Sequence, residues 1–335
     1  MKTKPTLGTV AKEAGVSIPT VSQVMRGTGR ISDETRERVM RAAKKLHYVP
    51  DSRAASMRSG ERREIGFVLN NFANPFNAEV VSGAVDLLEN EGYLVSLLDG
   101  RDDPERQFRH IEVFIRHGRG GLMWVPAFGT PPETSDLLAA HGIPTVAFLR
   151  PASNRFDYVG IRNAEATTEA TRHLAELGHT RIAYLGGTDM SFVRERRIEG
   201  YRSTMAQLGL GPPLVWPSPD GRREGMEAMQ SLCHAHPDVT AVVCNGDMVA
   251  LGACIALMKA GQTPGRDVSV VGFDDIDDAA LAIPPLTTMA VCPKRLGMKL
   301  ASVLLERIRD PNAPASITEV SATLTVRGTT GAPAR

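Results

Sequence analysis

A row of short side chains near the amino terminus is suited to contacts with base edges in a DNA groove. In residues 6–26, TLGTVAKEAGVSIPTVSQVMR, helical spacing turns Val21 and Val24 inward and leaves their neighbours pointing outward. The outward residues are Ile18, Pro19, Thr20, Ser22 and Gln23. A helix that presents small and hydrogen-bonding side chains fits the major groove of DNA. A helical hairpin with no DNA partner is the alternative that this segment leaves open.

Two short helices around a tight turn must hold this row in place. An apolar stripe within residues 10–14 forms the inner face of the first helix, and Gly15 supplies a left-handed residue at its end. Ser17 is a favourable N-cap for the second helix. Pro19 is tolerated because the first turn of a helix needs no amide donors. The segment therefore predicts a helix-turn-helix, a DNA-binding motif.

A third helix should complete this amino-terminal head. Ser32 is its expected N-cap, the helix should run to about His47, and Pro50 should stop the chain from continuing it. The inner stripe of this helix consists of Val39, Ala42, Ala43 and Leu46.

The charge of the chain is divided unevenly, and the division supports a nucleic-acid partner. Residues 1–63 hold 14 Lys and Arg against 6 Asp and Glu, a net charge of +8. The other 272 residues hold 25 against 32, a net charge of −7. A basic head on a mildly acidic body is expected when one end of a protein meets phosphates.

Composition excludes several classes of protein. The 335 residues are 42% hydrophobic and contain no apolar run that could span a bilayer and no secretory leader, which predicts a cytoplasmic protein without a membrane partner. The four cysteines form no CxxC pair, and the Cys233–His236 segment lacks a second pair of ligands, so no metal or cofactor is expected. The glycine-rich, P-loop, GxSxG and HExxH motifs are missing, so the chain is not expected to be an enzyme.

From Ile65 onward, apolar strand-like runs alternate with helical patterns. Strand–helix units run to about residue 150 and restart after residue 163. This alternation predicts an α/β core of two doubly wound parallel-sheet subdomains behind the all-α helix-turn-helix head. Ligands of such sheets bind at the carboxyl ends of the strands, so a cleft between the subdomains is the expected binding site.

With these elements in place, the chain resembles the LacI/GalR family of bacterial transcription repressors over essentially its whole length. The matching blocks are VAKEAGVSIPTVSQVM at 10–25, ISDETRERV at 31–39, LHYVP at 46–50, IGFVL at 65–69, HLAELGHTRIAYLGG at 173–187, RRIEGY at 196–201, NGDMVALGA at 245–253 and VSVVGFDDIDDAALAIPPLTTM at 268–289. The resemblance implies a homodimer that binds a near-palindromic double-stranded operator. It also implies a small effector bound in a periplasmic-binding-protein-like core.

The resemblance also implies a domain plan. The head spans residues 1–50, a hinge helix spans residues 51–60, and the effector-binding and dimerisation core spans residues 61–335. Within that core, subdomain 1 covers about 61–162 and 291–321, and subdomain 2 covers about 163–290 and 322–335.

The DNA-contacting positions of the family fall on matching residues of this chain. Those for base reading fall on Ile18, Pro19 and Gln23, and the wedge residue of the hinge, which enters the minor groove, falls on Met57. The phosphate or groove contacts fall on Ser17, Thr20, Ser22 and Arg30. Gln23 can pair bidentately with adenine, whereas relatives often carry an arginine there.

The effector positions of the family fall on Arg197, Asp247, Asp274 and Phe76. For two of them an ordinary structural role is the alternative: Asp247 could be only a helix N-cap, and Phe76 could be a core residue.

Two further arginines suggest what the effector is. Arg150 and Arg162 stand where relatives with neutral sugar ligands tend to carry aspartate. Together with Arg197 they predict a cleft lined by three guanidinium groups and an anionic effector, a sugar acid or sugar phosphate. The alternative is that Arg150 and Arg162 face solvent or pair with Asp157 and Asp189.

Overall fold

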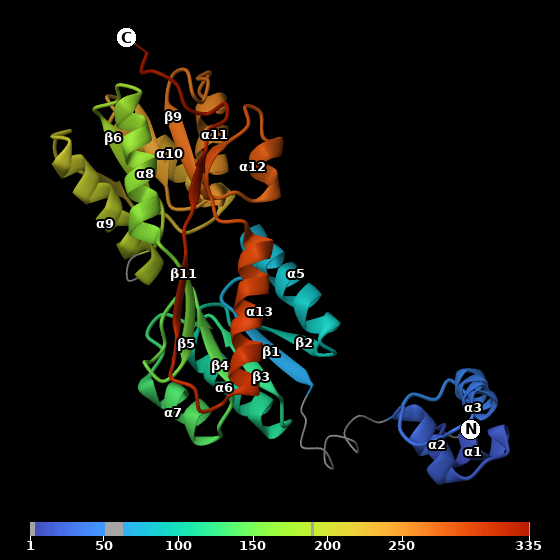
Figure 1. Ribbon diagram of the computed structural model, residues 1–335. Coiled ribbons are helices and arrows are strands. Elements are labelled where there is room, and N and C mark those ends of the chain that lie inside the picture. The colour runs from blue at the N-terminus through green and yellow to red at the C-terminus, as the bar shows by residue number, and fades with distance from the viewer. Residues whose placement is uncertain (1–3, 51–62, 189–190, 335) are drawn as a thin grey trace. The chain divides into compact units, whose positions relative to one another are not determined.

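The computed structural model describes residues 4–50, 63–188 and 191–334 (Figure 1). The chain divides into two compact units, residues 1–62 and 63–335, and each is described by itself. The expected hinge at 51–60, Met57 included, lies outside the described residues, as does Asp189.

The amino-terminal unit is built from short helices with local caps. They are α1 (Leu7–Ala14), α2 (Ile18–Met25) and α3 (Asp33–Lys45). Ser17 and Ser32 are the N-caps of α2 and α3, and Gly15 ends α1 in the left-handed conformation at φ 63°. The buried residues are those of the expected stripes, namely Val10, Ala11, Ala14, Val21, Val24, Val39, Ala42 and Ala43. The helix-turn-helix and the third helix are therefore present, with α3 ending two residues earlier than expected.

The larger unit contains two six-stranded sheets within its described residues. The first sheet is parallel throughout; its strands are, in spatial order, β11 (Ile317–Val320), β5 (Asp157–Ile161), β4 (Thr145–Phe148), β3 (Gly121–Trp124), β1 (Glu64–Leu69) and β2 (Leu94–Asp99). The second is parallel except for its first strand; its strands are β12 (Thr323–Thr325), β10 (Thr287–Ala290), β9 (Ser269–Asp274), β8 (Ala241–Cys244), β6 (Ile182–Leu185) and β7 (Leu214–Trp216). The α/β fold class predicted from the alternation is confirmed.

Helices cover both faces of each sheet, as the crossovers of parallel strands require. Around the first sheet lie α5 (Pro75–Asn90), α6 (Pro104–Arg116), α7 (Pro132–Ala140) and α13 (Pro293–Arg309). Around the second lie α8 (Asn163–Glu176), α9 (Phe192–Gln207), α10 (Arg222–Ala235), α11 (Asp247–Lys259) and α12 (Asp277–Leu281). Successive residues of β1 show the two faces: Phe67 packs in the cluster that includes α5 and α13, whereas Val68 packs with α6 and α7.

The chain passes between the sheets three times in its described part, after β5, after β10 and after β11. Helix α13 belongs with the first sheet, where it packs along α5 (Figure 1). Glycines allow this close approach, because a Cβ on Gly83 would lie 1.9 Å from the carbonyl oxygen of Lys294. None of the helices in the described residues is long and apolar enough to cross a membrane.

Four elements were not predicted from the sequence: β5, β11, α12 and α13. Strand β5 begins with Asp157, a charge that the sequence gives no reason to bury, and this carboxylate is paired with Arg307 at 2.7 Å. Strand β11 lies at a sheet edge and leaves Ile317 79% exposed, so it carries little apolar pattern. Helix α12 has five residues, too few for a helical period to be recognised.

Candidate DNA-binding face and effector pocket

The outward row of α2 contains both capping residues and accessible residues. The Ser17 hydroxyl caps the helix by accepting from the backbone N–H of Thr20 at 3.3 Å, and the two hydroxyls are hydrogen-bonded at 2.8 Å. Ile18 is 52% exposed, and Pro19 is exposed beside it. Arg30, in the turn before α3, is exposed as well. Ile18, Pro19 and Arg30 are therefore accessible to a DNA groove.

Gln23 is less exposed than an outward-facing residue would be. It is half-buried, as is Ser22, and its side chain lies against the backbone of Gly29. A Cβ added to Gly29 would lie 3.0 Å from Oε1 of Gln23, and Gly29 itself has φ 82°. A glycine at this position therefore leaves room for the Gln23 amide.

In the larger unit, polar side chains from the strand ends of both sheets line one cavity of about 80 Å³, which we call the inter-sheet pocket. From the first sheet and α5 come Asn70, Asn74, Phe76, Asn77, Leu149 and Arg150. From the second sheet and its helices come Ser191, Val193, Arg197, Asp220, Asn245, Gly246, Met248, Val249 and Asp274. The carboxyl ends of parallel strands are where α/β sheets bind their ligands. Among the described residues, no His, Cys, Asp and Glu side chains gather in a group that could hold a metal ion.

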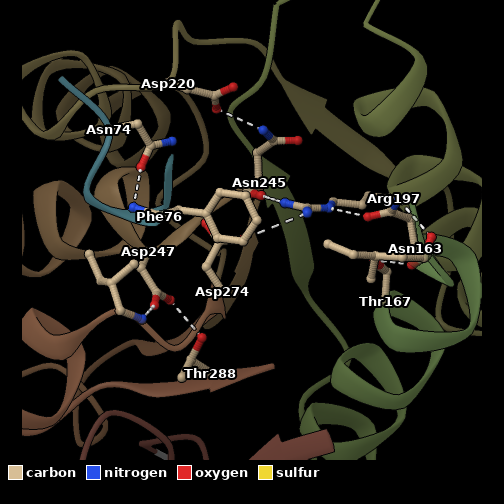
Figure 2. A network of polar contacts seen from close by, with 12 residues as sticks. Asn74, Phe76, Asn163, Thr167, Arg197, Asp220, Asn245, Asp247, Asp274 and Thr288 are labelled. Atoms are coloured by element: carbon tan, nitrogen blue, oxygen red, sulfur yellow. Dashed lines mark hydrogen bonds and ion pairs between the residues drawn. The ribbon is translucent and has the colours of Figure 1, made fainter. Parts of the chain in front are cut away.

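Arg197 is the most constrained cation of this pocket (Figure 2). Its Nε donates to Oδ1 of Asn163 at 2.8 Å, and its Nη1 donates to the backbone oxygen of Asn245. Its guanidinium lies 3.4 Å from the ring centroid of Phe273, and Nη2 is 3.8 Å from Oδ1 of Asp274. With a side chain only 6% exposed, Arg197 is a fixed positive charge rather than a mobile one.

Asp274 lies opposite this charge at the carboxyl end of β9. It has φ 117°, a conformation that costs a residue with a side chain free energy and that is often found at binding sites. Burial raises the pKa of its carboxyl well above the usual value, against the lowering effect of Arg197 and with a further rise from Asp247. The carboxyl group is therefore an uncommonly basic acceptor for hydrogen bonds.

Asn245 connects the residues at the centre of the pocket. Its Oδ1 accepts from the Tyr184 hydroxyl at 2.7 Å, which fixes the amide so that Nδ2 donates to Asp220 at 2.7 Å. Asp220 is exposed and lines the pocket, and Figure 2 shows its hydrogen bond with Asn245. The network therefore presents a carboxylate with a defined orientation to whatever enters.

Asp247 does not line the inter-sheet pocket, although the resemblance placed it among the effector residues. It is fully buried, where its carboxylate accepts from the Thr288 hydroxyl at 2.6 Å and from the backbone N–H of Ile276 at 3.0 Å. Burial raises its pKa to about 7 against these two hydrogen bonds. The N-cap alternative is wrong, because Gly246 is the N-cap and Asp247 is the first helical residue. Asp247 therefore holds the segment after β9 in place.

The three arginines do not form the cluster expected from the sequence. Arg150 and Arg197 line the inter-sheet pocket, whereas Arg162 precedes α8 with a side chain 49% exposed and 3.6 Å from Glu165. Arg150 is paired with Asp102, while Asp157 is paired with Arg307 and Asp189 lies outside the described residues. The position of Arg150 at a strand end correctly predicted that it lines the pocket. Arg162 also follows a strand, but it lies at the start of α8 and faces solvent.

Phe76 packs in the core, as the alternative expected, and it also lines the pocket, where its contact with an effector stays a prediction. Five polar residues of the pocket were not predicted from the sequence, namely Asn70, Asn74, Asn77, Asn245 and Asp220. Several of these follow apolar strands directly, as in VLNN and VVCNG. The rule that ligands bind at strand ends would have found them.

A helix-turn-helix head joined to a two-sheet core with a polar pocket defines a ligand-responsive DNA-binding protein. Comparisons with known proteins agree with this class. Residues 6–51 match "Bacterial regulatory proteins, lacI family", and residues 171–330 match "Periplasmic binding protein-like domain".

The maltose regulon regulatory protein MalI of Escherichia coli K12 is 33% identical over 91% of this chain and 93% of its own length. The transcriptional repressor PurR of Haemophilus influenzae PittEE is 32% identical over 90% of this chain and 91% of its own. The chain belongs to the lacI family, and it is a DNA-binding transcriptional regulator with an effector-binding core. Its relatives are regulators, which are not enzymes.

Solved structures support the same assignment. The transcriptional regulator CelR in complex with cellobiose aligns with a TM-score of 0.73 at 31% identity, covering 97% of this chain and 99% of that one. The lac repressor dimer bound to operator and the anti-inducer ONPF aligns with a TM-score of 0.87 at 25% identity, covering 98% and 100%. The family and the fold inferred from the sequence motifs are confirmed.

Proposed function

We propose that this regulator is a repressor that acts in the cytoplasm as a homodimer on a near-palindromic operator. Its operator affinity changes when a small sugar binds in the inter-sheet pocket. The observation that carries the proposal is the convergence of oriented amide and carboxylate groups on that pocket, from the strand ends of both sheets. The lac repressor, whose structure is a dimer on its operator, supports the homodimer and the DNA partner.

A polyhydroxylated ligand suits this pocket chemically. Sugar hydroxyls both donate and accept hydrogen bonds, and the pocket offers carboxylate acceptors in Asp220 and Asp274 and amide donors in several asparagines. Phe76 supplies an apolar surface for the face of a sugar ring. CelR, which is similar over almost its whole length, was solved with the sugar cellobiose.

The balance of charge favours a neutral sugar over a sugar acid or sugar phosphate. Arg150 and Arg197 each lie beside a carboxylate, Asp102 and Asp274 respectively, so neither arginine is available without displacing a partner. An anionic ligand would also meet Asp220. The anionic effector inferred from three arginines is therefore the second candidate, since only two of the three line the pocket.

Ligand binding would act on DNA through the two subdomains. The pocket draws residues from both, and its volume of about 80 Å³ is below the roughly 300 Å³ typical of ligand sites. A sugar would therefore enter only when the two subdomains separate slightly and settle again around it. In a dimer this adjustment changes the spacing of the two heads, and so the free energy of operator binding.

Operator contacts follow the residues of the head. Ile18, Pro19 and Gln23 would face base edges, while Ser17, Thr20, Ser22 and Arg30 would approach the backbone or the groove walls. Met57, in the hinge expected at 51–60, is the proposed minor-groove wedge.

Calorimetry on the full-length protein tests the ligand class. The probes are cellobiose, maltose and ribose, each paired with its aldonic acid, and the variants are Asp220→Asn and the matched control Asp238→Asn. Asp238 is an exposed aspartate paired with Arg181, outside the pocket. We expect a neutral sugar to bind, with affinity about tenfold or more weaker in Asp220→Asn and unchanged in Asp238→Asn. Binding of the acids alone would favour the anionic effector, and equal loss in both variants would contradict the pocket assignment.

A further inference from the structure

Arg150 lies at the border between the inter-sheet pocket and two outer cavities of about 480 and 560 Å³. It follows β4, and its side chain is 11% exposed. A ligand that enters the pocket from either outer cavity therefore passes this guanidinium.

The guanidinium is already engaged on several sides. Its Nη1 and Nη2 donate to the two carboxylate oxygens of Asp102, the second at 3.0 Å, and Nη1 also donates to the backbone oxygen of Pro126 at 2.9 Å. Its plane lies 3.7 Å from the ring centroid of Phe128. Asp102 follows β2, and Pro126 and Phe128 follow β3, so all of these partners belong to the first sheet. The assembly is therefore complete without any contribution from the second subdomain or a ligand.

This pairing uses the geometry by which an arginine would capture an anionic ligand. Two parallel N–H donors and two carboxylate oxygens form the strong bidentate arrangement that also binds free carboxylates and phosphates. A ligand anion could take this place only by displacing Asp102 and leaving that carboxylate unpaired. Displacing one partner of a partly buried ion pair is costly, because the remaining charge keeps its desolvation penalty.

We propose that Asp102 sets the charge selectivity of the inter-sheet pocket by occupying Arg150. The pair makes the entrance neutral, admits hydroxylated ligands without charge and rejects carboxylate and phosphate groups. This inference rests on the proposed function for the location of the effector, but the charge of the entrance is testable without knowing the effector.

The test uses the full-length protein with D-glucuronate and inorganic phosphate as probes. The variants are Asp102→Asn, the double variant Asp102→Asn with Arg150→Gln, and the charge-matched control Asp238→Asn, whose carboxylate lies outside these cavities. We expect Asp102→Asn to bind glucuronate about tenfold or more tightly than the wild type does, since one bidentate site is released. Phosphate should raise the melting temperature of this variant more than that of the wild type.

The gain in glucuronate affinity must vanish in the double variant and be absent from Asp238→Asn. Asp102→Ser also removes the carboxylate that pairs with Arg150, so it should show the same gain in glucuronate affinity. This second variant controls for a folding defect that the asparagine of Asp102→Asn alone would cause. Equal anion binding by the wild type and both Asp102 variants would overturn the proposal, as would a gain that persists without Arg150. If no neutral sugar binds the wild type but the anion gain appears, the selectivity proposal stands and the sugar assignment fails.

Discussion

Replacing Arg197 by methionine tests the electrostatics of the inter-sheet pocket. The substitution keeps most of the side-chain length but removes the charge, the hydrogen bonds to Asn163 and Asn245 and the ion pair with Asp274. At the 3.8 Å separation of Nη2 and Oδ1, an effective dielectric constant of about 20 gives an attraction of about 4 kcal/mol. Removing one partner of a buried pair typically costs about 3–5 kcal/mol, because the other is left uncompensated. We expect the free energy of unfolding to fall by that amount near neutral pH.

The pH dependence of this loss identifies its cause. Burial raises the pKa of Asp274, and Arg197 opposes that rise, so Arg197→Met should raise it further. A carboxyl group with a raised pKa in the folded state stabilises the fold below its unfolded pKa, and this stability is lost as pH rises through the folded pKa. The deficit of Arg197→Met should therefore be smaller at acidic pH, where the Asp274 carboxyl group is protonated with or without Arg197, than at alkaline pH. Adding Asp274→Asn should remove this pH dependence and recover at least about 1 kcal/mol.

The assay is urea unfolding followed by tryptophan fluorescence. The two tryptophans report on both sheets, since Trp124 is in β3 and Trp216 is in β7. Arg162→Met is the control, because Arg162 is exposed and its loss should change stability by less than about 0.5 kcal/mol. A deficit equal at acidic and alkaline pH, or one that Asp274→Asn fails to reduce, would refute the reasoning.

Four further substitutions test the head and the helix packing. Gln23→Ala should relax base preference at one symmetric pair of operator positions by about 1–3 kcal/mol, and binding titrations that show unchanged preference would contradict its role as a reader. Gly15→Ala should destabilise the head by about 1 kcal/mol, because Gly15 has φ 63°. Gly8→Ala should stabilise the head by a similar amount, because the new Cβ would meet only ordinary contacts inside α1. Thermal unfolding that shows a change of the same sign for both variants would count against this. Gly83→Ala should lower the stability of the larger unit by about 1–3 kcal/mol, because the new Cβ would overlap the Lys294 carbonyl. An unchanged urea midpoint would contradict this and show that α5 and α13 can move apart without cost.

Local sequence signals predicted the head almost completely. The caps at Ser17 and Ser32 and the left-handed Gly15 act over three or four residues, so neighbouring residues determine them. The alternating core was predictable for a related reason, because buried parallel strands are apolar along their whole length. Strands β5 and β11 were not predicted, because a buried charge interrupts the apolar pattern of β5 and an exposed sheet edge interrupts that of β11.

The candidate site was predicted in its general location but not in its contacts. Arg197, Asp274 and Phe76 do line the inter-sheet pocket, since each lies near a strand end or helix start that the sequence marks. Asp247 carries the same signal, yet its carboxylate turns to Thr288, 41 residues away in the chain. Which way a side chain at a strand end points depends on the neighbouring strand, and sequence order does not give that neighbour.

The sequence by itself determined that this protein has a DNA-binding head, an α/β core and polar groups at the strand ends. Tertiary structure alone decided which charges meet. Arg150 pairs with Asp102, 48 residues away, because β2, β1, β3 and β4 lie in that order in the first sheet and carry the loops with these residues to one edge. Arg162, only 12 positions further along the chain than Arg150, precedes a helix instead and faces solvent. Caps and strands depend on local spacing, whereas ion pairs depend on the order of strands in space, and that order is fixed only when the whole core packs.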